Sequence, residues 1–116
     1  MDTQIEAVEI AYEFLLAYAA QGREDDATGP GRKSREVVGE LDAALAAIAT
    51  QLDDTISFSS VIAADIDKTR RALALVAAQP RISSELIDNL NASMHLRAVL
   101  TDLFLLSEAR RITAHP

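Results

Sequence analysis

The sequence predicts an all-α protein, an antiparallel four-helix bundle whose long C-terminal helix pairs with a second copy of the chain. Three observations support this prediction. Alanine and leucine, both strong helix formers, are the most frequent of the 116 residues. Helix breakers are scarce, with four glycines and three prolines. Apolar residues recur three and four positions apart in several segments, which places them on one face of a helix. The length fits a single domain over residues 1–116.

The first helix is expected over residues 3–21. Thr3 and Glu6 have the spacing of a capping box, in which the hydroxyl accepts from the backbone and the carboxylate reaches back to it. One face then carries an apolar stripe, which consists of Ile5, Val8, Tyr12, Leu15 and Ala19. Gly22 is a natural end for this helix.

Residues 22–33 follow without any periodic apolar pattern. They contain three glycines, one proline and six charged residues. Because so few apolar groups are available to offset the entropy of ordering, we expect a flexible, solvated loop here.

The second helix is expected over residues 34–53 and the third over residues 58–79. The second carries a heptad seam, which consists of Val38, Leu41, Leu45, Ile48 and Leu52. Helix propensity falls over residues 54–57, where short polar side chains compete for backbone hydrogen bonds, so we predict a turn. One continuous helix through both segments is the alternative. The third stripe consists of Phe58, Ile62, Ile66, Thr69, Leu73 and Val76, and Pro80 ends that helix.

The last helix is expected to run from Ser83 to about Ile112, roughly 29 residues or about 43 Å at the usual rise. Ile82 and Ile87 flank its N-cap as a hydrophobic staple. In its second half, apolar residues surround the helix almost completely: Leu96, Val99, Leu100, Leu103, Phe104, Leu105 and Leu106. A helix that is apolar all round is buried on more than one side.

A four-helix monomer buries one stripe of each helix, so a second apolar face of the last helix would stay in water. Soluble monomers rarely keep such a patch. Two copies related by a two-fold axis would cover it with the same surface. We therefore predict a homodimer interface that consists of Leu96, Val99, Leu103, Phe104, Leu105 and Leu106.

The chain is acidic, with a net charge of −7 and an isoelectric point of about 4.7. Its 11 basic residues are dispersed among 18 acidic ones, which disfavours nucleic-acid binding. The N-terminus has neither the basic region nor the apolar core of a signal peptide. No apolar run approaches the roughly 20 residues that a bilayer requires. We expect a cytoplasmic location and no membrane contact.

The residue types needed for metal binding are poorly represented. Cysteine is absent, which excludes disulfides, thiolate nucleophiles and Cys-ligated metals. Neither His95 nor His115 has a glutamate three residues before it, so the Glu-x-x-His pairs of helical metal sites are missing. We therefore predict no metal and no cofactor.

Two carboxylate pairs, Asp53–Asp54 and Asp65/Asp67, are conceivable acid and base groups. Both are expected at exposed positions, whereas acid–base catalysis needs a pocket and separated pKa values. The glycine-containing segment at residues 29–31 lacks the strand and the Lys-Ser context of a phosphate-binding loop.

His95 gives one resemblance to a known class. Histidine phosphotransfer domains are also small, acidic helical bundles with one exposed histidine, and the resemblance would make His95 a phospho-acceptor. That family places a lysine three residues after the histidine and then a glycine, where this chain has Ala98 and Val99. The sequence therefore favours a structural or surface histidine.

Arg110 and His115 are separated by four residues near the C-terminal end. This Arg-x4-His spacing resembles the active motif of HEPN ribonucleases, which are also small, helical and dimeric. The resemblance implies that His115 acts as the base on a ribose 2′-hydroxyl and that Arg110 stabilises charge at the phosphate. It covers seven or eight residues, Arg111 replaces the family's polar residue after the arginine, and the chain ends one residue after His115. The other interpretation is that basic residues complement the dipole of the last helix.

The sequence thus favours a non-catalytic helical interaction module, such as an adaptor, a regulator or a chaperone-like subunit. Its expected partners are a second copy of the chain and another protein. The alternatives are a HEPN-like ribonuclease that uses Arg110 and His115 and a phosphotransfer protein that uses His95. Loss of ribonuclease activity in His115→Ala would support the first alternative, and acid-labile phosphate on His95 the second.

Overall fold

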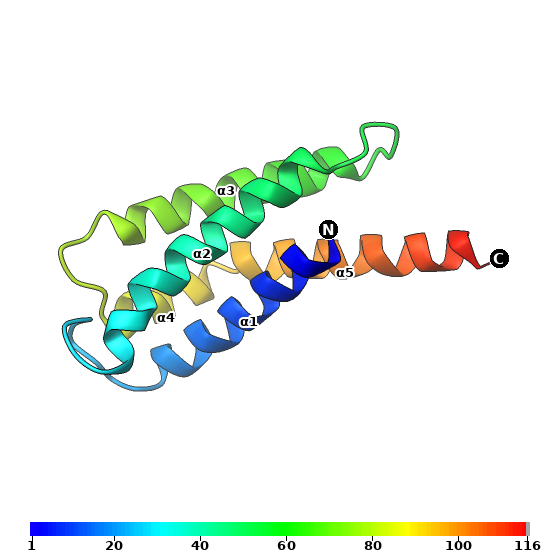
Figure 1. Ribbon diagram of the computed structural model, residues 1–116. Coiled ribbons are helices and arrows are strands. Elements are labelled where there is room, and N and C mark those ends of the chain that lie inside the picture. The colour runs from blue at the N-terminus through cyan, green and yellow to red at the C-terminus, as the bar shows by residue number, and fades with distance from the viewer. Residues whose placement is uncertain (116) are drawn as a thin grey trace.

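The computed structural model describes residues 1–115, which form five helices and no strand. These are α1 (Asp2–Ala19), α2 (Pro30–Thr50), α3 (Ser59–Ala77), α4 (Ser84–Ala92) and α5 (His95–Ala114) (Figure 1). Helix accounts for 76% of the chain, so the all-α prediction is confirmed.

The helices lie side by side in an elongated body of 50 × 23 × 20 Å. Figure 1 shows that the chain reverses direction from α1 to α2, from α2 to α3 and from α3 to α4, whereas α5 continues away from α4. Helix α1 packs against α2 and α4, and α3 packs against α2 and α5. The core therefore runs along the whole body between these helices.

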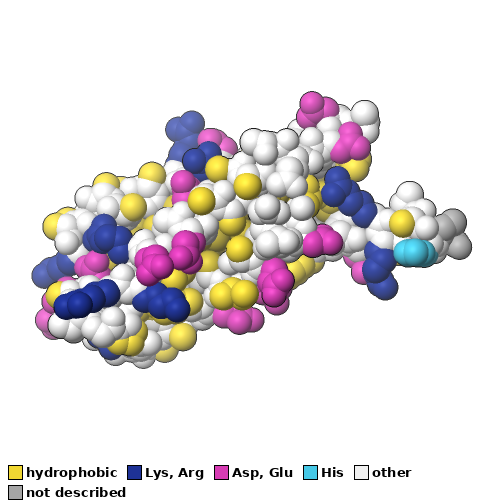
Figure 2. Space-filling view, viewed as in Figure 1, with side chains coloured by type: hydrophobic (Ala, Val, Ile, Leu, Met, Phe, Trp, Pro, Cys, Tyr) yellow, Lys and Arg dark blue, Asp and Glu magenta, His cyan; other side chains and the backbone are white. Residues whose placement is uncertain are grey.

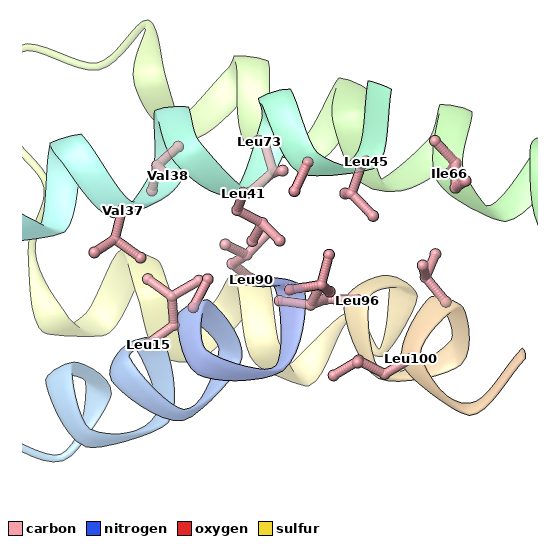
Figure 3. Close-up of a cluster of buried hydrophobic side chains, with 14 of the residues drawn as sticks. Leu15, Val37, Val38, Leu41, Leu45, Ile66, Leu73, Leu90, Leu96 and Leu100 are labelled. Carbon is pink, nitrogen blue, oxygen red and sulfur yellow. The ribbon is translucent and has the colours of Figure 1, made fainter. Parts of the chain in front are cut away.

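The heptad seam of α2 lies in the middle of this core. Its predicted members Val38, Leu41, Leu45 and Ile48 are buried, and Leu52, beyond the end of the helix, is partly buried. They pack with apolar side chains from the other helices, among them Leu15, Ile66, Leu73, Leu90 and Leu96, as Figure 3 shows. The predicted face of α2 is thus confirmed.

Helix α1 starts one residue earlier than predicted, at Asp2, and the predicted capping box does not form. Its N-cap is Met1, which provides no side-chain hydrogen bond. Helical backbone at Asp2 places Thr3 inside the helix, where its hydroxyl cannot act as the cap. The stripe itself is confirmed for Ile5, Val8 and Leu15, which are buried.

The loop after α1 is shorter than predicted, because α2 begins at Pro30 rather than at residue 34. Proline suits the first turn of a helix, where its missing N–H would be unpaired in any case. Gly29 precedes it with φ +56°, a left-handed conformation that glycine adopts without strain.

Polar contacts tie this loop to the segment before α4. We call this group the polar hub, and it consists of Tyr18, Arg23, Asp26, Arg35, Ile82 and Ser84. The buried Tyr18 hydroxyl donates to the carbonyl oxygen of Ile82 at 2.6 Å. The Ser84 hydroxyl donates to the Tyr18 carbonyl oxygen at 2.7 Å and accepts from the Arg23 N–H at 2.8 Å.

Asp26 completes the polar hub. Its carboxylate accepts from the Ile82 N–H at 2.9 Å and from Nε of Arg35 at 3.0 Å. The Ile82 N–H and the Arg35 guanidinium hold the pKa of this carboxyl below its ordinary value. The sequence offered no apolar anchor for residues 22–33, and the structure anchors them through polar groups instead.

The turn predicted between the second and third helices is present, and α2 and α3 are separate helices. The Asp53 carboxylate accepts from both the N–H and the hydroxyl of Thr55, at 2.9 and 2.6 Å. The Ser59 hydroxyl donates to the Asp53 carbonyl oxygen at 2.7 Å. These local bonds satisfy the backbone where the helix stops, as the polar composition indicated.

The prediction of one long helix from Ser83 to Ile112 is wrong. The Ser83 cap is confirmed, because its hydroxyl accepts from the Leu86 N–H at 3.0 Å, but α4 ends at Ala92 and α5 starts at His95. Ser93 donates its hydroxyl to the Leu90 carbonyl oxygen at 2.6 Å, and Met94 adopts a left-handed conformation with φ +65°. Asn91 and Ser93 are weak helix formers, which makes this a favourable place for the break.

Replacing Met94 with glycine is expected to raise the free energy of unfolding by about 1 kcal/mol, because a left-handed conformation costs a non-glycine residue that order of energy. The side chain is more than half exposed, so little packing is lost. Denaturant unfolding measures the change. Ala98→Gly, at an exposed helical position, is the matched control and should lower stability by about 0.5–1 kcal/mol. Equal losses in both variants would contradict the strain at Met94.

Candidate protein interaction surface

The C-terminal part of α5 extends beyond the helices on which it packs. Figure 1 shows it running past the N-terminus of α1 to the end of the molecule. The last buried residue of the helix is Leu106, and every residue from Glu108 to His115 is exposed. Two turns of helix are therefore free to contact another molecule.

The structure divides the six predicted interface residues into two groups. Leu96, Val99, Leu103 and Leu106 are buried in the chain's own core. Phe104 and Leu105 are exposed, by 46% and 57%. The division arises because α5 lies against both α1 and α3, which together cover a wider sector of the helix than one stripe. In this fold only the second group is available to a partner.

Ile112 belongs with this second group and was not predicted. It is 61% exposed and follows Leu105 by seven residues, which places both on the same side of the helix. We call this surface the outer face of α5. It consists of Thr101, Phe104, Leu105, Glu108 and Ile112. The spacing of seven residues from Leu105 is the signal that could have identified Ile112, which lies beyond the dense apolar run that ends at Leu106.

Arg110 and Arg111 lie on the same projecting end. Figure 2 shows basic side chains and a histidine there, opposite acidic side chains on the α2–α3 turn. Arg111 pairs with Glu108 one turn away, with Nε and a carboxylate oxygen 3.1 Å apart. Arg110 instead contacts the N-terminal residue of the chain, and its Nη1 atom is 3.5 Å from Sδ of Met1. Hydrogen bonds from Thr55 lower the pKa of Asp53, and the positive charge of Arg110 adds a smaller lowering.

The structure does not gather Arg110 and His115 into one pocket. A hollow of about 550 Å³ is lined by Met1, Asp2, Ser107, Arg110 and Arg111. His115 is not among the residues that line it and lies exposed at the C-cap of α5. A base and a charge-stabilising group need a shared position for the reacting atoms, and of these two residues only Arg110 lines this hollow.

His95 is the first residue of α5 and is half-buried. It follows Met94 at the break between the two helices, whereas the sequence predicts a position inside a continuous helix. The break gives His95 a different setting from a histidine in the middle of an exposed helix face, which is what the phosphotransfer alternative assumed.

The predicted carboxylate pairs are not pairs in the structure. Asp53 is held in its turn by Thr55, whose hydroxyl and N–H lower its pKa. Asp67 forms an exposed ion pair with Arg71, 3.0 Å between Oδ2 and Nε. Asp65 instead meets Asp102 across the contact between α3 and α5.

Asp102 is the most perturbed acid of the described residues. Burial, the hydrogen bond to Asp65 and the charge of Asp65 together raise its pKa to about 7. Its Oδ2 atom is shielded from solvent and has no hydrogen-bond partner among the described residues. The sequence did contain a signal, because Asp102 lies three residues after Val99 and four before Leu106, in a row that is otherwise apolar.

Over residues 1–115 no group of three or more His, Cys, Asp and Glu side chains is arranged to hold a metal ion. Within the same part of the chain, no helix combines the length and the apolar character needed to span a membrane. Comparison of the chain with models of protein families, with curated proteins and with solved structures found no match.

Proposed function

We propose that this chain is a non-catalytic helical interaction module that forms a homodimer through the outer face of α5. In this proposal α4 and α5 together take the place of the fourth helix of an antiparallel bundle. The dimer acts in the cytoplasm and presents its remaining surface to another protein. The observation that carries the proposal is the exposure of Phe104, Leu105 and Ile112 on a helix end that extends beyond the core.

Three large apolar side chains on one helix face favour association with a similar face. Full burial of a fully exposed side chain of this size contributes roughly 1.5–3 kcal/mol, and these three, which are 46–61% exposed, would each gain about half of that. A two-fold axis doubles the number, because each copy supplies the same three side chains. The total is comparable with the estimated 4–15 kcal/mol that association costs in lost freedom of motion. A small dimer interface of this kind is therefore energetically feasible.

The charges of the outer face are compatible with this pairing. Glu108 is the acidic residue on it, and Arg111 of the same helix already neutralises it through two hydrogen bonds. Two copies that meet along this face therefore bring no uncompensated charge of Glu108 against each other. The Thr101 hydroxyl donates to the Arg97 carbonyl oxygen at 2.9 Å, so it does not need a hydrogen-bond partner across the interface.

Size-exclusion chromatography with light scattering tests the proposal. We expect the mass of a dimer at micromolar concentration. Leu105→Glu should give the mass of a monomer, because a charge would be buried at the interface without a partner. Its far-ultraviolet circular dichroism should stay helical, because Leu105 is not part of the core.

Leu75→Glu is the matched control. Leu75 is 66% exposed on α3, so the substitution adds the same charge to an equally exposed leucine away from the outer face of α5. The mass of this variant should remain that of a dimer. A monomer for the unmodified chain, or equal effects of the two substitutions, would contradict an interface on α5.

A further inference from the structure

We infer that Asp65 and Asp102 form a proton-sharing pair of carboxyl groups that fastens α5 to α3 and makes this contact weaken as the pH rises through neutrality. The part of the inference that concerns dimerisation rests on the proposed function. The part that concerns the contact between the two helices does not. Neither Asp65 nor Asp102 belongs to the outer face of α5.

The position of the pair follows from the packing of two apolar rows. On α5, Asp102 lies between Val99 and Leu106, both of which are buried. On α3, Asp65 lies next to Ile62 and Ile66, which are also buried. Both carboxyl groups are themselves half-buried where α3 and α5 pack.

The chemistry of the pair requires a proton. An ionised carboxylate only accepts hydrogen bonds, so two of them cannot bond to each other. The hydrogen bond between Asp65 and Asp102 therefore needs one protonated group, whose O–H donates to the other. The shielded Oδ2 of Asp102 has no hydrogen-bond partner within the described residues.

No nearby cation takes the place of this proton. The charge that acts on Asp102 comes from Asp65. Lys68 on α3 and Arg97 on α5, the basic residues close in sequence, are exposed. The charged side chains of the other two helices that pack on α5 are exposed as well: Asp2, Glu6, Glu9 and Glu13 on α1, and Glu85 and Asp88 on α4.

The direction of the pH dependence follows from the raised pKa. The folded chain holds a proton on Asp102 up to about pH 7, whereas the unfolded chain releases it near pH 4. The stabilising contribution is therefore complete at acidic pH and is lost progressively as the pH rises to about 7. Above that pH two like charges face each other between α3 and α5.

Denaturant unfolding between pH 5 and pH 8 tests the fastening. We expect the unfolding equilibrium constant to rise by about tenfold to a hundredfold over this range, and the midpoint to fall. In Asp102→Asn the amide donates to Asp65 at every pH, so this contribution to the dependence should disappear. At pH 8 the variant should be more stable than the unmodified chain. Asp65→Asn should behave in the same way, which guards against a folding defect in one variant.

Asp67→Asn is the matched control, because Asp67 lies two residues from Asp65 but forms an exposed pair with Arg71. It should keep the pH dependence of the unmodified chain. The other titratable groups of the chain are identical in these variants apart from the substituted residue, so only the difference between variants is assigned to the pair. The inference is overturned if Asp102→Asn and Asp67→Asn show the same dependence.

The link to dimerisation is tested by light scattering at pH 6 and pH 8. If the outer face depends on the position of α5, the dimer should be weaker at pH 8, so that monomers appear at a higher protein concentration than at pH 6. Asp102→Asn should remove this difference between the two pH values. A dimer of equal strength at both pH values overturns the regulatory part. A monomer at both contradicts the proposed function, whereas the unfolding experiment decides separately whether the pair fastens α5.

Discussion

Replacing Leu45 with alanine is expected to lower the free energy of unfolding by about 2–5 kcal/mol, the range measured for leucine in well-packed cores. The side chain is fully buried in the middle of the α2 seam, between Leu41 and Ile48. It packs in the centre of the core that Figure 3 shows. Alanine would leave a cavity, and side chains from several helices would have to shift to fill it. The shift of the denaturation midpoint at constant slope measures the loss.

Leu75→Ala is the control for this measurement. It removes the same atoms from an exposed position on α3, and surface substitutions of this kind usually change stability by less than about 0.5 kcal/mol. Similar losses in the two variants would show that α2 does not turn Leu45 toward the core.

Gly31→Ala is expected to destabilise the protein by about 1–3 kcal/mol, the usual effect of overpacking. A Cβ atom at this position would lie 2.8 Å from the Cα atom of Asp26 and 3.2 Å from the carbonyl oxygen of Asp25. Both are backbone atoms, so no side-chain rotation relieves the contact. Because Asp26 belongs to the polar hub, moving its backbone also strains the hydrogen bond to the Ile82 N–H.

Gly39→Ala, in the same helix, should have the opposite effect. A Cβ atom there meets nothing within 4 Å, so the substitution removes only the conformational freedom of glycine in a helix. The gain is about 0.5–1 kcal/mol. Thermal or denaturant unfolding of the two variants should give shifts of opposite sign. Two shifts of the same sign would mean that the loop does not lie against the start of α2.

The helices that could be predicted are those whose signals are local. Apolar spacing located the core face of α2, Pro80 marked the end of α3, and the Ser83 cap fixed the start of α4. The break at Met94 has no comparable signal, because neither glycine nor proline occurs there. It depends on how α4 and α5 pack against α1 and α3. The anchoring by Tyr18 was also hidden, because its acceptor at Ile82 is 64 residues away.

The candidate site was predicted in part for the same reason. The sequence showed that α5 is apolar on nearly every side, and the structure leaves Phe104 and Leu105 of that helix exposed. The sequence could not show which sides the chain covers itself, so Leu96 and Val99 were assigned to a partner although they lie in the core. The carboxyl pair required knowing that α3 and α5 are neighbours, which spacing within one helix does not reveal.

The polar hub has a consequence for the order in which the molecule assembles. Four of its hydrogen bonds join residues that are 56 to 66 positions apart, whereas α2 and α3 are connected by a short turn. Closing a long loop costs more chain entropy than closing a short one, so contacts between distant segments gain stability only after nearby ones exist. We therefore expect the α2–α3 hairpin to form before the hub closes. The hub closes late and joins the first helix to the last third of the chain, so that disrupting it should speed unfolding more than it slows folding.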